Sequence, residues 1–550
     1  MGILRSIRLG ITLLSATATL KGATAETVSP WLKWHFVGTR AVKANAKAGK
    51  VKEIWGLPES RRLSSAIVQG LAQAPEREAF GAEASAPTVR RRIATQFVEE
   101  ILTFESFGEI NGPLQEHPNL SLAVKLPKAR PEEWDRNIRR YLGTLGWKAP
   151  EQNPESETPD WTAAHENPSY LTRFVQHGDW VFFSIGPDAY SQVPTWIVEK
   201  NKDAIPALED GIVLTLASRL EGLADWLLDV SLPMLPEVHA HIRLDDYGVR
   251  TEGTVALKQA VTDPLPDWTP PTEQVFSPII GFSGTRGLNN VISSLPAAQR
   301  LVQEGLPDQL YSWARPAPVS SNAIPIFPIY MAWPIPNEAI SIADLTKRLP
   351  LIAGPGIMQS GNARLVSQPA RNEAILSVMP RFIQPFVTGV TNNTHGLRIA
   401  GLFPHTKLLN PAPDALFAQL DSREKVVYYQ WEITQHRIEL YKPLLRFISF
   451  LFKKPQSSAS GPGFRWLTAI ESKLGNTVTI VTAPEQKKLQ FFRKSHIGFT
   501  GLELTLLSEW LASSSFPWID KQLFSTWEMQ EFLAAPTTPV TPQRNAKARR

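Results

Sequence analysis

The sequence predicts an α+β protein with two tandem homologous modules, each with an antiparallel β-sheet and flanking helices, preceded by a helical N-terminal region. Three observations predict this class: alternating strands are mixed with amphipathic helices, a tight hairpin is present, and one order of elements recurs. The predicted boundaries are 1–25 for a signal peptide, 26–111 for the helical region, 112–305 and 306–533 for the modules, and 534–550 for a disordered basic tail.

The first 25 residues have the order of a secretory signal. Arg5 and Arg8 make a positive start, Leu9 to Leu20 is apolar but too short to span a bilayer, and Ala23-Thr24-Ala25 supplies a small-residue cleavage pattern. An organelle transit peptide is the alternative, because the segment also lacks acidic residues. We expect export to the periplasm or the extracellular space, with a mature chain that starts at Glu26.

Composition is that of a globular protein, with 43% hydrophobic and 20% charged residues in a chain of 550. The 17 tryptophans are expected mainly in cores. The absence of cysteine excludes disulfides, thiol chemistry and thiolate metal sites. Leu444 to Phe452 is the most apolar later stretch, but it is short and contains Arg446, so it predicts a packed helix and no transmembrane span.

The formal net charge of +5 is concentrated at the chain ends. The basic residues of these ends are Arg5, Arg8, Lys21, Arg544, Lys547, Arg549 and Arg550. The body between them is slightly acidic and has no basic stripe, which argues against a nucleic-acid partner.

The N-terminal region is predicted to be helical because Ile93, Phe97 and Ile101 recur every four residues. The first module then starts with alternating apolar residues from Leu120 to Leu126, followed by a helix that Pro131 opens. The further elements predicted for this module are a polar loop from Lys148 to Pro159, a strand Trp180 to Ile185, a helix Pro194 to Lys200, a strand Ile212 to Leu216, a helix Arg219 to Leu228 and a hairpin Val238 to Leu257 that turns at Asp245 to Gly248.

The second module repeats this order. The elements predicted for it are a strand Ile329 to Trp333, a helix Glu338 to Leu349, a strand Leu397 to Phe403, a helix Asp414 to Leu420, a strand Val426 to Trp431, a helix after Thr434 and a hairpin from Thr477 to Lys494 with Pro484 in its loop. His177-Gly178 recurs as His395-Gly396 at nearly the offset that relates Ile280-Gly281-Phe282-Ser283-Gly284 to Ile497-Gly498-Phe499-Thr500-Gly501. Matching offsets with matching element order predict a duplication, in which both pentapeptides occupy one strand-to-helix junction.

Two stretches, Tyr428 to Thr434 and Arg493 to Glu503, resemble a family of uncharacterised exported bacterial proteins. The resemblance covers about the last two-thirds of the chain. It supports export, and it implies no catalytic residue because that family has no assigned activity.

Two serine motifs are better explained by structural roles than by catalysis. Gly281-Phe282-Ser283-Gly284-Thr285 lacks the final glycine of a hydrolase nucleophile elbow, and its counterpart has Thr500, which is better placed as a helix N-cap with Glu503 in a capping box. Ser422 to Lys425 fits the S-x-x-K pattern of penicillin-binding enzymes, but Ser360-Gly361-Asn362 precedes it, the reverse of that family's order, and a polar turn is expected instead.

The metal-like and nucleotide-like patterns of the sequence also have structural explanations. His239 and His241 share one side of a strand, but a third ligand is lacking and Arg243 lies in line, so a solvated strand face is expected. Glu432, His436 and Glu439 have helical spacing, which the end of a strand at Glu432 would interrupt. Gly354-Pro355-Gly356 predicts a helix end, and Pro168 interrupts a helical metal motif at His165-Glu166.

The sequence therefore assigns no catalytic, cofactor-binding or metal-ligating residue. The leading hypothesis is a non-enzymatic periplasmic or envelope protein that binds a protein or envelope component or assists assembly. The alternative is a hydrolase whose site lies in the cleft between the two modules, with residues scattered in the sequence. The oligomeric state is left open.

Overall fold

The computed structural model describes residues 30–80, 88–112, 118–165, 170–186, 208–209, 211–222, 235–293, 307–316, 327–335, 363–368, 373–378, 386–391, 396–401, 410–451, 461–513 and 516. The predicted signal peptide, the basic tail, and the helices expected at Pro194 to Lys200 and at Glu338 to Leu349 lie outside these residues.

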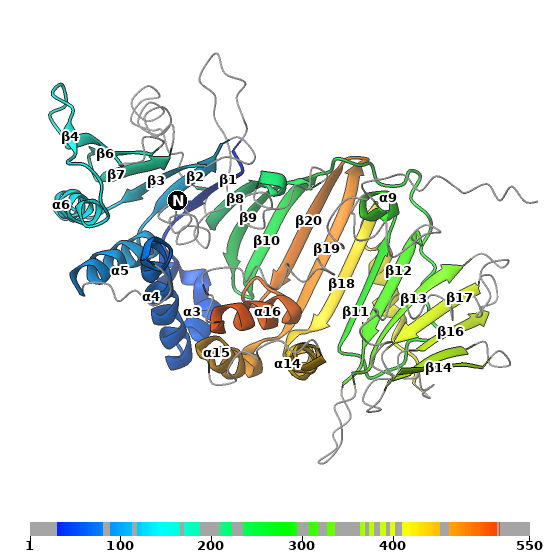
Figure 1. Ribbon diagram of the computed structural model, residues 1–550. Helices are drawn as coiled ribbons and strands as arrows, with labels where there is room; N and C mark the ends of the chain where they lie inside the picture. The colour runs from blue at the N-terminus through cyan, green and yellow to red at the C-terminus, as the bar shows by residue number, and fades with distance from the viewer. Residues whose placement is uncertain are drawn as a thin grey trace, which may run out of the picture.

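Within the described residues the chain forms one antiparallel sheet of 20 strands, which runs from β4 at one end to β14 at the other (Figure 1). In spatial order the first ten strands are β4 (Glu151–Gln152), β5 (Asp160–Ala164), β6 (Leu171–His177), β7 (Trp180–Gly186), β3 (Asn119–Lys125), β2 (Ser106–Asn111), β1 (Leu32–Phe36), β8 (Ile212–Arg219), β9 (Glu237–Asp245) and β10 (Gly248–Ala256). The sheet continues through β20 (Lys488–Ser495), β19 (Asn476–Glu485), β18 (Val426–Ile433), β11 (Gly281–Arg286), β12 (Gln309–Ala314), β13 (Ile329–Ile335), β17 (Gly396–Gly401), β16 (Phe386–Thr391), β15 (Glu373–Val378) and β14 (Ala363–Gln368).

The order of pairing is the same on both sides of the central β10–β20 pair. Counted outward from this pair, the first half runs β10, β9, β8, β1, β2, β3, β7, β6, β5, β4, and the second half runs β20, β19, β18, β11, β12, β13, β17, β16, β15, β14. At every step the strand of the second half has a number ten higher than the strand of the first half. The register agrees as well, because β8 carries an irregularity between Ile212 and Leu214 against β9, and β18 carries one between Val426 and Tyr428 against β19. We call β1–β10 the first half of the sheet and β11–β20 the second half.

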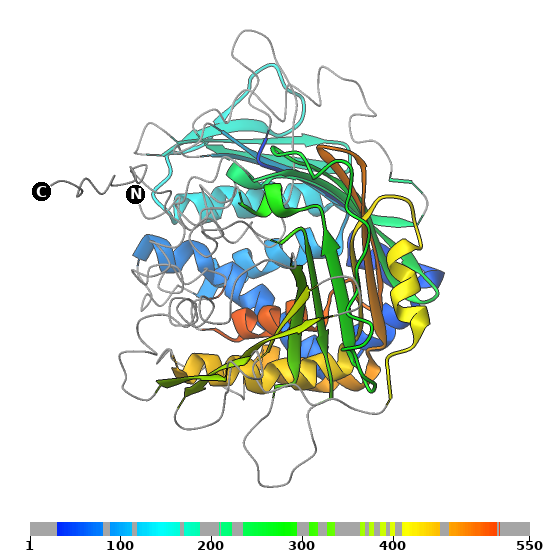
Figure 2. The ribbon, with the colours of Figure 1, turned by 90° about the vertical axis from the view of Figure 1, so that its right-hand side faces the viewer.

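Side chains on neighbouring strands share a face when their residues are paired, because successive residues point to opposite faces. We call face A the face that carries Trp34, Leu216 and Ile242, and face B the face that carries Lys33 and His241. The helices that pack on face A or on one another beside it are α2 (Thr39–Ala44), α3 (Gly49–Trp55), α4 (Pro58–Phe80), α5 (Thr88–Thr103), α6 (Arg130–Gly143), α14 (Thr434–Leu451), α15 (Pro462–Ile470) and α16 (Gly501–Ala512). Figure 2 shows the sheet curving around these helices.

The core of the first half lies on face A. Trp34, Leu122 and Val124 from β1 and β3 are buried against α6, which contributes Trp134 and Ile138. These helix residues follow the spacing of an amphipathic helix that Pro131 begins, as predicted. The core is therefore held by the helices of the long β1–β2 connection and of the β3–β4 connection.

The large core of the second half lies on face B instead. Phe282, Tyr311 and Tyr429 are buried on three adjacent strands beneath Phe417 and Leu420, which come from α13 (Asp414–Ala418) and the short helix η3 (Gln419–Asp421). In Figure 2, α13 lies on the outer side of the curved sheet, opposite the other helices. The two halves thus share a pairing order, but their largest cores lie on opposite faces, and smaller buried clusters lie on the other face of each half.

Several sequence predictions are confirmed. The strands predicted at Leu120 to Leu126, Trp180 to Ile185, Ile212 to Leu216 and Val426 to Trp431 correspond to β3, β7, β8 and β18, and both hairpins are present as β9–β10 and β19–β20. Pro484 belongs to β19 and not to the turn. Tryptophans are prominent among the largest fully buried side chains, in agreement with a core role: Trp31, Trp34, Trp161, Trp313 and Trp466.

The N-terminal stretch 26–111 is not helical throughout. It contains β1 and β2, which pair with each other across the intervening helices and place β1 beside β8. Trp34 fits against Gly108, where a Cβ atom would lie 2.0 Å from the indole ring. β1 finds its partners only beyond the helices that follow it, so the helical pattern dominates a local interpretation of this stretch.

The predicted equivalence of the two pentapeptides is wrong. Gly281 to Gly284 form the start of β11, directly after Ile280, whereas Ile497 to Gly501 follows β20 and leads into α16. Phe282 is 2% exposed and Phe499 is 43% exposed, so the two rings also differ in burial. The two similar pentapeptides adopt different backbone conformations. Gly498 has a φ of 91°, which favours glycine, whereas the matching Gly281 lies in an extended strand.

Candidate ligand-binding groove

The described residues form a groove of about 800 Å³ on face B of the central strands. It crosses β2, β1, β8, β9, β10, β20 and β19, so it joins the two halves of the sheet. The residues whose side chains point to its face are Lys33, Phe107, Thr215, Ala217, His239, His241, Glu252, Thr254, Ile480, Thr482, Gln490 and Phe492, and Arg423 lines it from the turn before β18.

Small side chains create this groove. Thr215 and Ala217 of β8 lie at the register positions that Tyr429 and Trp431 occupy in β18. Tyr429 and Trp431 pack in the core of the second half, whereas Thr215 and Ala217 are half-buried and line the groove. Face B is therefore filled by aromatic rings in the second half and left hollow at the same steps of the first half.

The two histidines of β9 lie where their sequence spacing predicts, on one face of the strand and in the groove. His241 also meets Glu252 of β10, with Nε2 and Oε2 separated by 3.3 Å. Sequence reasoning missed Glu252, although a signal was present: the turn at Asp246-Tyr247 fixes the hairpin register and so sets Glu252 opposite His241. Thr215 is opposite His241 on the other side, so these three side chains form one row.

Among the described residues, no three side chains of His, Cys, Asp or Glu gather as a metal site. Arg243 lies two residues from His241 on the same face, and Arg250 is paired with it across the strands. Glu109 of β2 is opposite Lys33 on face B, and burial raises the pKa of Glu109 to about 7. The groove therefore combines hydrogen-bonding side chains, cations and a carboxyl that titrates near neutrality beside it.

Cations stand at both ends of the groove. The Lys33 ammonium lies 5.8 Å from the centre of the Phe107 ring in the first half. The Arg423 guanidinium lies 5.2 Å from the centre of the Phe492 ring in the second half. A cation over an aromatic face is held in place by the ring quadrupole, so both charges are positioned at the groove.

The serine candidates do not meet a general base in the described residues. Ser283 lies in β11, and its hydroxyl is 2.8 Å from that of Ser312 on the neighbouring strand. Ser422 follows η3 in a turn, as predicted, with its N–H donating to the Gln419 carbonyl. Ser360-Gly361-Asn362 and Gly354-Pro355-Gly356 lie outside the described residues, as does Glu166 beside His165.

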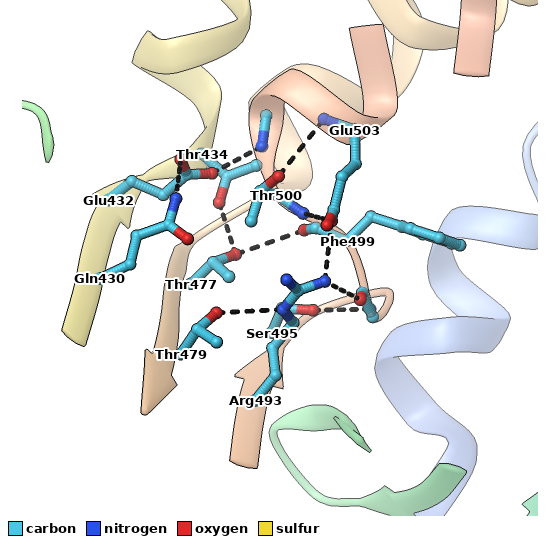
Figure 3. A network of polar contacts seen from close by, with 12 residues as sticks. Gln430, Glu432, Thr434, Thr477, Thr479, Arg493, Ser495, Phe499, Thr500 and Glu503 are labelled. Atoms are coloured by element: carbon cyan, nitrogen blue, oxygen red, sulfur yellow. Dashed lines mark hydrogen bonds and ion pairs between the residues drawn. The ribbon is translucent and has the colours of Figure 1, made fainter. Parts of the chain in front are cut away.

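The capping role predicted for Thr500 is confirmed (Figure 3). The Thr500 hydroxyl accepts the Glu503 N–H at 3.3 Å, and the Glu503 carboxylate accepts the Thr500 N–H at 2.8 Å. Arg493 of β20 ties this cap to the sheet by donating to Glu503 at 2.8 Å and to Thr479 at 3.0 Å. These contacts anchor the start of α16 on face A, away from the groove.

Glu432 is a buried member of the same network and lies in β18, as predicted, which breaks the helical spacing with His436 and Glu439. Its Oε1 accepts the Gly501 N–H at 2.6 Å, and its Oε2 accepts from Gln430 at 3.3 Å. Burial raises the pKa of Glu432, and the Gly501 hydrogen bond opposes that shift. His436 and Glu439 bond to each other at 2.9 Å on the exposed side of α14.

No helix among the described residues is both long and apolar enough to cross a membrane. Leu444 to Leu451 instead form the last part of α14. Comparison with known proteins yields no match: neither a protein-family model, nor a curated protein, nor a solved structure matches the chain.

Proposed function

We propose that this chain is an exported, non-enzymatic binding protein whose ligand lies in the groove on face B. The observation that carries the proposal is the groove itself, which crosses the junction of the two halves and is lined by Lys33, His241 and Arg423. Open concave sites with convergent polar groups are where proteins bind ligands. The order of charge, apolar stretch and cleavage pattern in residues 1–25 supports export.

The recurring pairing order supports a duplication with revised boundaries. The matched strands run from Leu32 to Ala256 and from Gly281 to Ser495. We propose these as the two tandem modules, in place of 112–305 and 306–533. The shared position of the irregularities in β8 and β18 supports a common ancestor, because such bulges are specific features of a strand and not a general property of sheets.

The row formed by Thr215, His241 and Glu252 favours one alternative, a hydrolase acting between the halves. A hydroxyl, an imidazole and a carboxylate in line are the parts of a nucleophile, its base and the group that orients the base. The His241–Glu252 contact is long and half-exposed, and we place the binding proposal first for that reason. His241→Ala separates the two, because it would abolish hydrolysis of any bound compound but leave most binding intact.

The binding proposal is tested by filling the groove. The double variant Thr215→Tyr/Ala217→Trp installs the side chains that the second half has at these positions, and both sites are half-buried, so the fold has room for them. Wild-type protein and the variant would be applied to an array of defined oligosaccharides and peptides, and the affinities of bound compounds measured in solution.

We expect the wild-type protein to bind at least one compound and the filled variant to lose about tenfold or more of that affinity. Ala41→Trp on exposed α2 is the matched control for adding an indole, and it should bind like the wild type. Circular dichroism and thermal unfolding would show that both variants fold. The binding proposal would be contradicted if the filled variant bound as tightly as the wild type, or if the wild type bound none of the compounds.

A further inference from the structure

We infer that the ligand of this groove is an acidic glycan chain that lies across the strands. The inference rests on the proposed binding function and adds the chemistry of the ligand. It is carried by three features of face B: the charge of the groove, a row of like charges beside it, and the orientation of the groove relative to the strands.

The charge of the groove favours an anion. Lys33 and Arg423 supply two cations, and Glu252 is the only carboxylate among the described residues that line the groove, while Glu109 lies beside it opposite Lys33. The Glu252 carboxylate lies within 3.3 Å of His241 and is thus directed to a neighbouring ring. The two cations stand in different halves of the sheet, so a ligand that met both would bridge them.

A row of like charges adjoins the groove. Arg243, Arg250 and Lys494 are directly paired across β9, β10 and β20, and all three point to face B. Like charges directly opposite each other destabilise a sheet. Asp245 forms an ion pair with Arg250, and Lys494 lies 4.4 Å from the centre of the Tyr247 ring. Arg243 in turn lies 3.6 Å from Glu209. Two carboxylates among three cations leave one excess positive charge in the row, and an anionic ligand would relieve the remaining repulsion.

The orientation of the groove favours a glycan over a peptide. Extended peptides bind sheets by pairing with an edge strand, whose backbone groups are free. This groove crosses the faces of seven strands in the interior of the sheet, where each strand has partners on both sides. Recognition must therefore use side chains, and His239, Thr254 and Gln490 offer donors and acceptors suited to sugar hydroxyls.

The dimensions require an elongated ligand. Neighbouring strands are about 4.8 Å apart, so seven strands span roughly 29 Å. A monosaccharide would meet one cation only, whereas a chain with carboxylates along its length would reach Lys33 and Arg423 together. We therefore expect affinity to grow with chain length until both cations are engaged.

The test measures solution binding of the full exported chain to four probes: hexagalacturonate, digalacturonate, neutral cellohexaose and a hexaglutamate peptide. We expect hexagalacturonate to bind at least about tenfold tighter than the other three. Raising the salt from about 0.05 M to about 0.5 M should weaken that binding, because exposed charges are screened. The double variant Lys33→Gln/Arg423→Gln should weaken it by about tenfold or more.

The matched control is Lys47→Gln/Arg62→Gln, which removes two exposed cations from η1 (Ala46–Ala48) and α4, on the opposite side of the sheet. It keeps the same net charge as the groove variant and should bind like the wild type. Equal loss in both variants would mean that net charge alone attracts the glycan, and it would overturn the inference.

Two other outcomes would also overturn it, and they separate the inference from the proposed function. If cellohexaose or the peptide binds best and Thr215→Tyr/Ala217→Trp abolishes that binding, the groove is a binding site but its ligand is not an acidic glycan. If hexagalacturonate binds equally well to the filled variant, then the acidic glycan is held elsewhere, and the proposed function loses its site as well.

Discussion

The two halves of the sheet pair their strands in one order, but their largest cores lie on opposite faces. At β1 the first half presents Trp34 to face A and Lys33 to face B, whereas at the matching steps of β11 the second half has Ser283 on face A and Phe282 on face B. The covering elements differ accordingly, with α6 over face A of the first half and α13 over face B of the second. Strand order therefore does not decide where a core forms; the connections that supply cover decide it.

The largest expected effect tests the core of the second half. Phe282→Ala should lower the free energy of unfolding by about 3–5 kcal/mol, because the ring is buried and its loss leaves a cavity. Lys33→Ala at the matching position of the first half should change it by less than about 0.5 kcal/mol. Urea denaturation of both variants measures the difference. Similar losses would show that face B of the first half, whose small buried cluster contains Phe107 and Phe182, stabilises the fold as much as the face B core of the second half.

The reverse comparison on face A is the second test. Trp34→Ala should cost about 3–5 kcal/mol of unfolding free energy, because the indole is 2% exposed. Ser283→Ala at the matching step should cost about 0.5–1.5 kcal/mol, because it loses one hydrogen bond to Ser312. Thermal unfolding is a second measure. If Ser283→Ala were as damaging as Trp34→Ala, then the smaller face A cluster of the second half, which contains Ile280, Ala314 and Leu440, would stabilise the fold as much as the core around Trp34.

Two buried polar residues at matching positions should differ less in their contribution to the free energy of unfolding. Glu432 of β18 matches Ser218 of β8 on face A, and both are buried. Glu432→Ala leaves the Gly501 N–H without its acceptor and should cost roughly 1–3 kcal/mol, whereas Glu432→Gln keeps an acceptor oxygen and should cost less. Ser218→Ala loses one hydrogen bond, to the Trp31 carbonyl, and should cost about 0.5–1.5 kcal/mol. A Glu432→Gln loss equal to that of Glu432→Ala would show that its charge, and not its hydrogen bond, stabilises α16.

The smallest expected effect is a pH dependence confined to the first half. Glu109 lies where the second half has Trp313, and burial raises its pKa from 4.5 to about 7. Its folded pKa exceeds the unfolded value, so folding favours the protonated acid, and its contribution to stability is lost as the pH rises from about 4.5 through about 7. Glu109→Gln should therefore stabilise the protein at pH ~8 by on the order of 1–2 kcal/mol and leave it unchanged at pH ~4. Stability curves for wild type and variant that run parallel over this range would contradict the assignment.

Local patterns predicted those elements whose partners are close in sequence. The β9–β10 hairpin follows from alternation around Asp245 to Gly248, and the helix α6 follows from Pro131 and its apolar spacing. The cap at Thr500 also follows from local spacing. Each of these elements is determined by residues within one or two turns of the chain.

Elements with distant partners were missed. β2 (Ser106–Asn111) contains Gly108, which weakens a strand pattern, and its fit depends on Trp34 from across four helices. β5 (Asp160–Ala164) and β6 (Leu171–His177) pair with sequence neighbours and were missed for another reason, because they are short and Trp161 of β5 also depends on Asp135 of α6. The candidate groove was missed for the same reason as β2, apart from its two histidines, because its lining comes from seven strands and from the absence of bulk at Thr215 and Ala217.

The central pairing of β10 with β20 also has a consequence for folding during synthesis on the ribosome. β10 is complete at Ala256, but its partner begins only at Lys488. At a synthesis rate of ~5–20 residues per second, the intervening chain takes roughly 10–50 s to make. During that interval the edge of β10 has no native partner, and an unpaired edge is a template for association between nascent chains. Arg250, the third residue of that strand, places a charge on the unpaired edge, and charged edges resist such association.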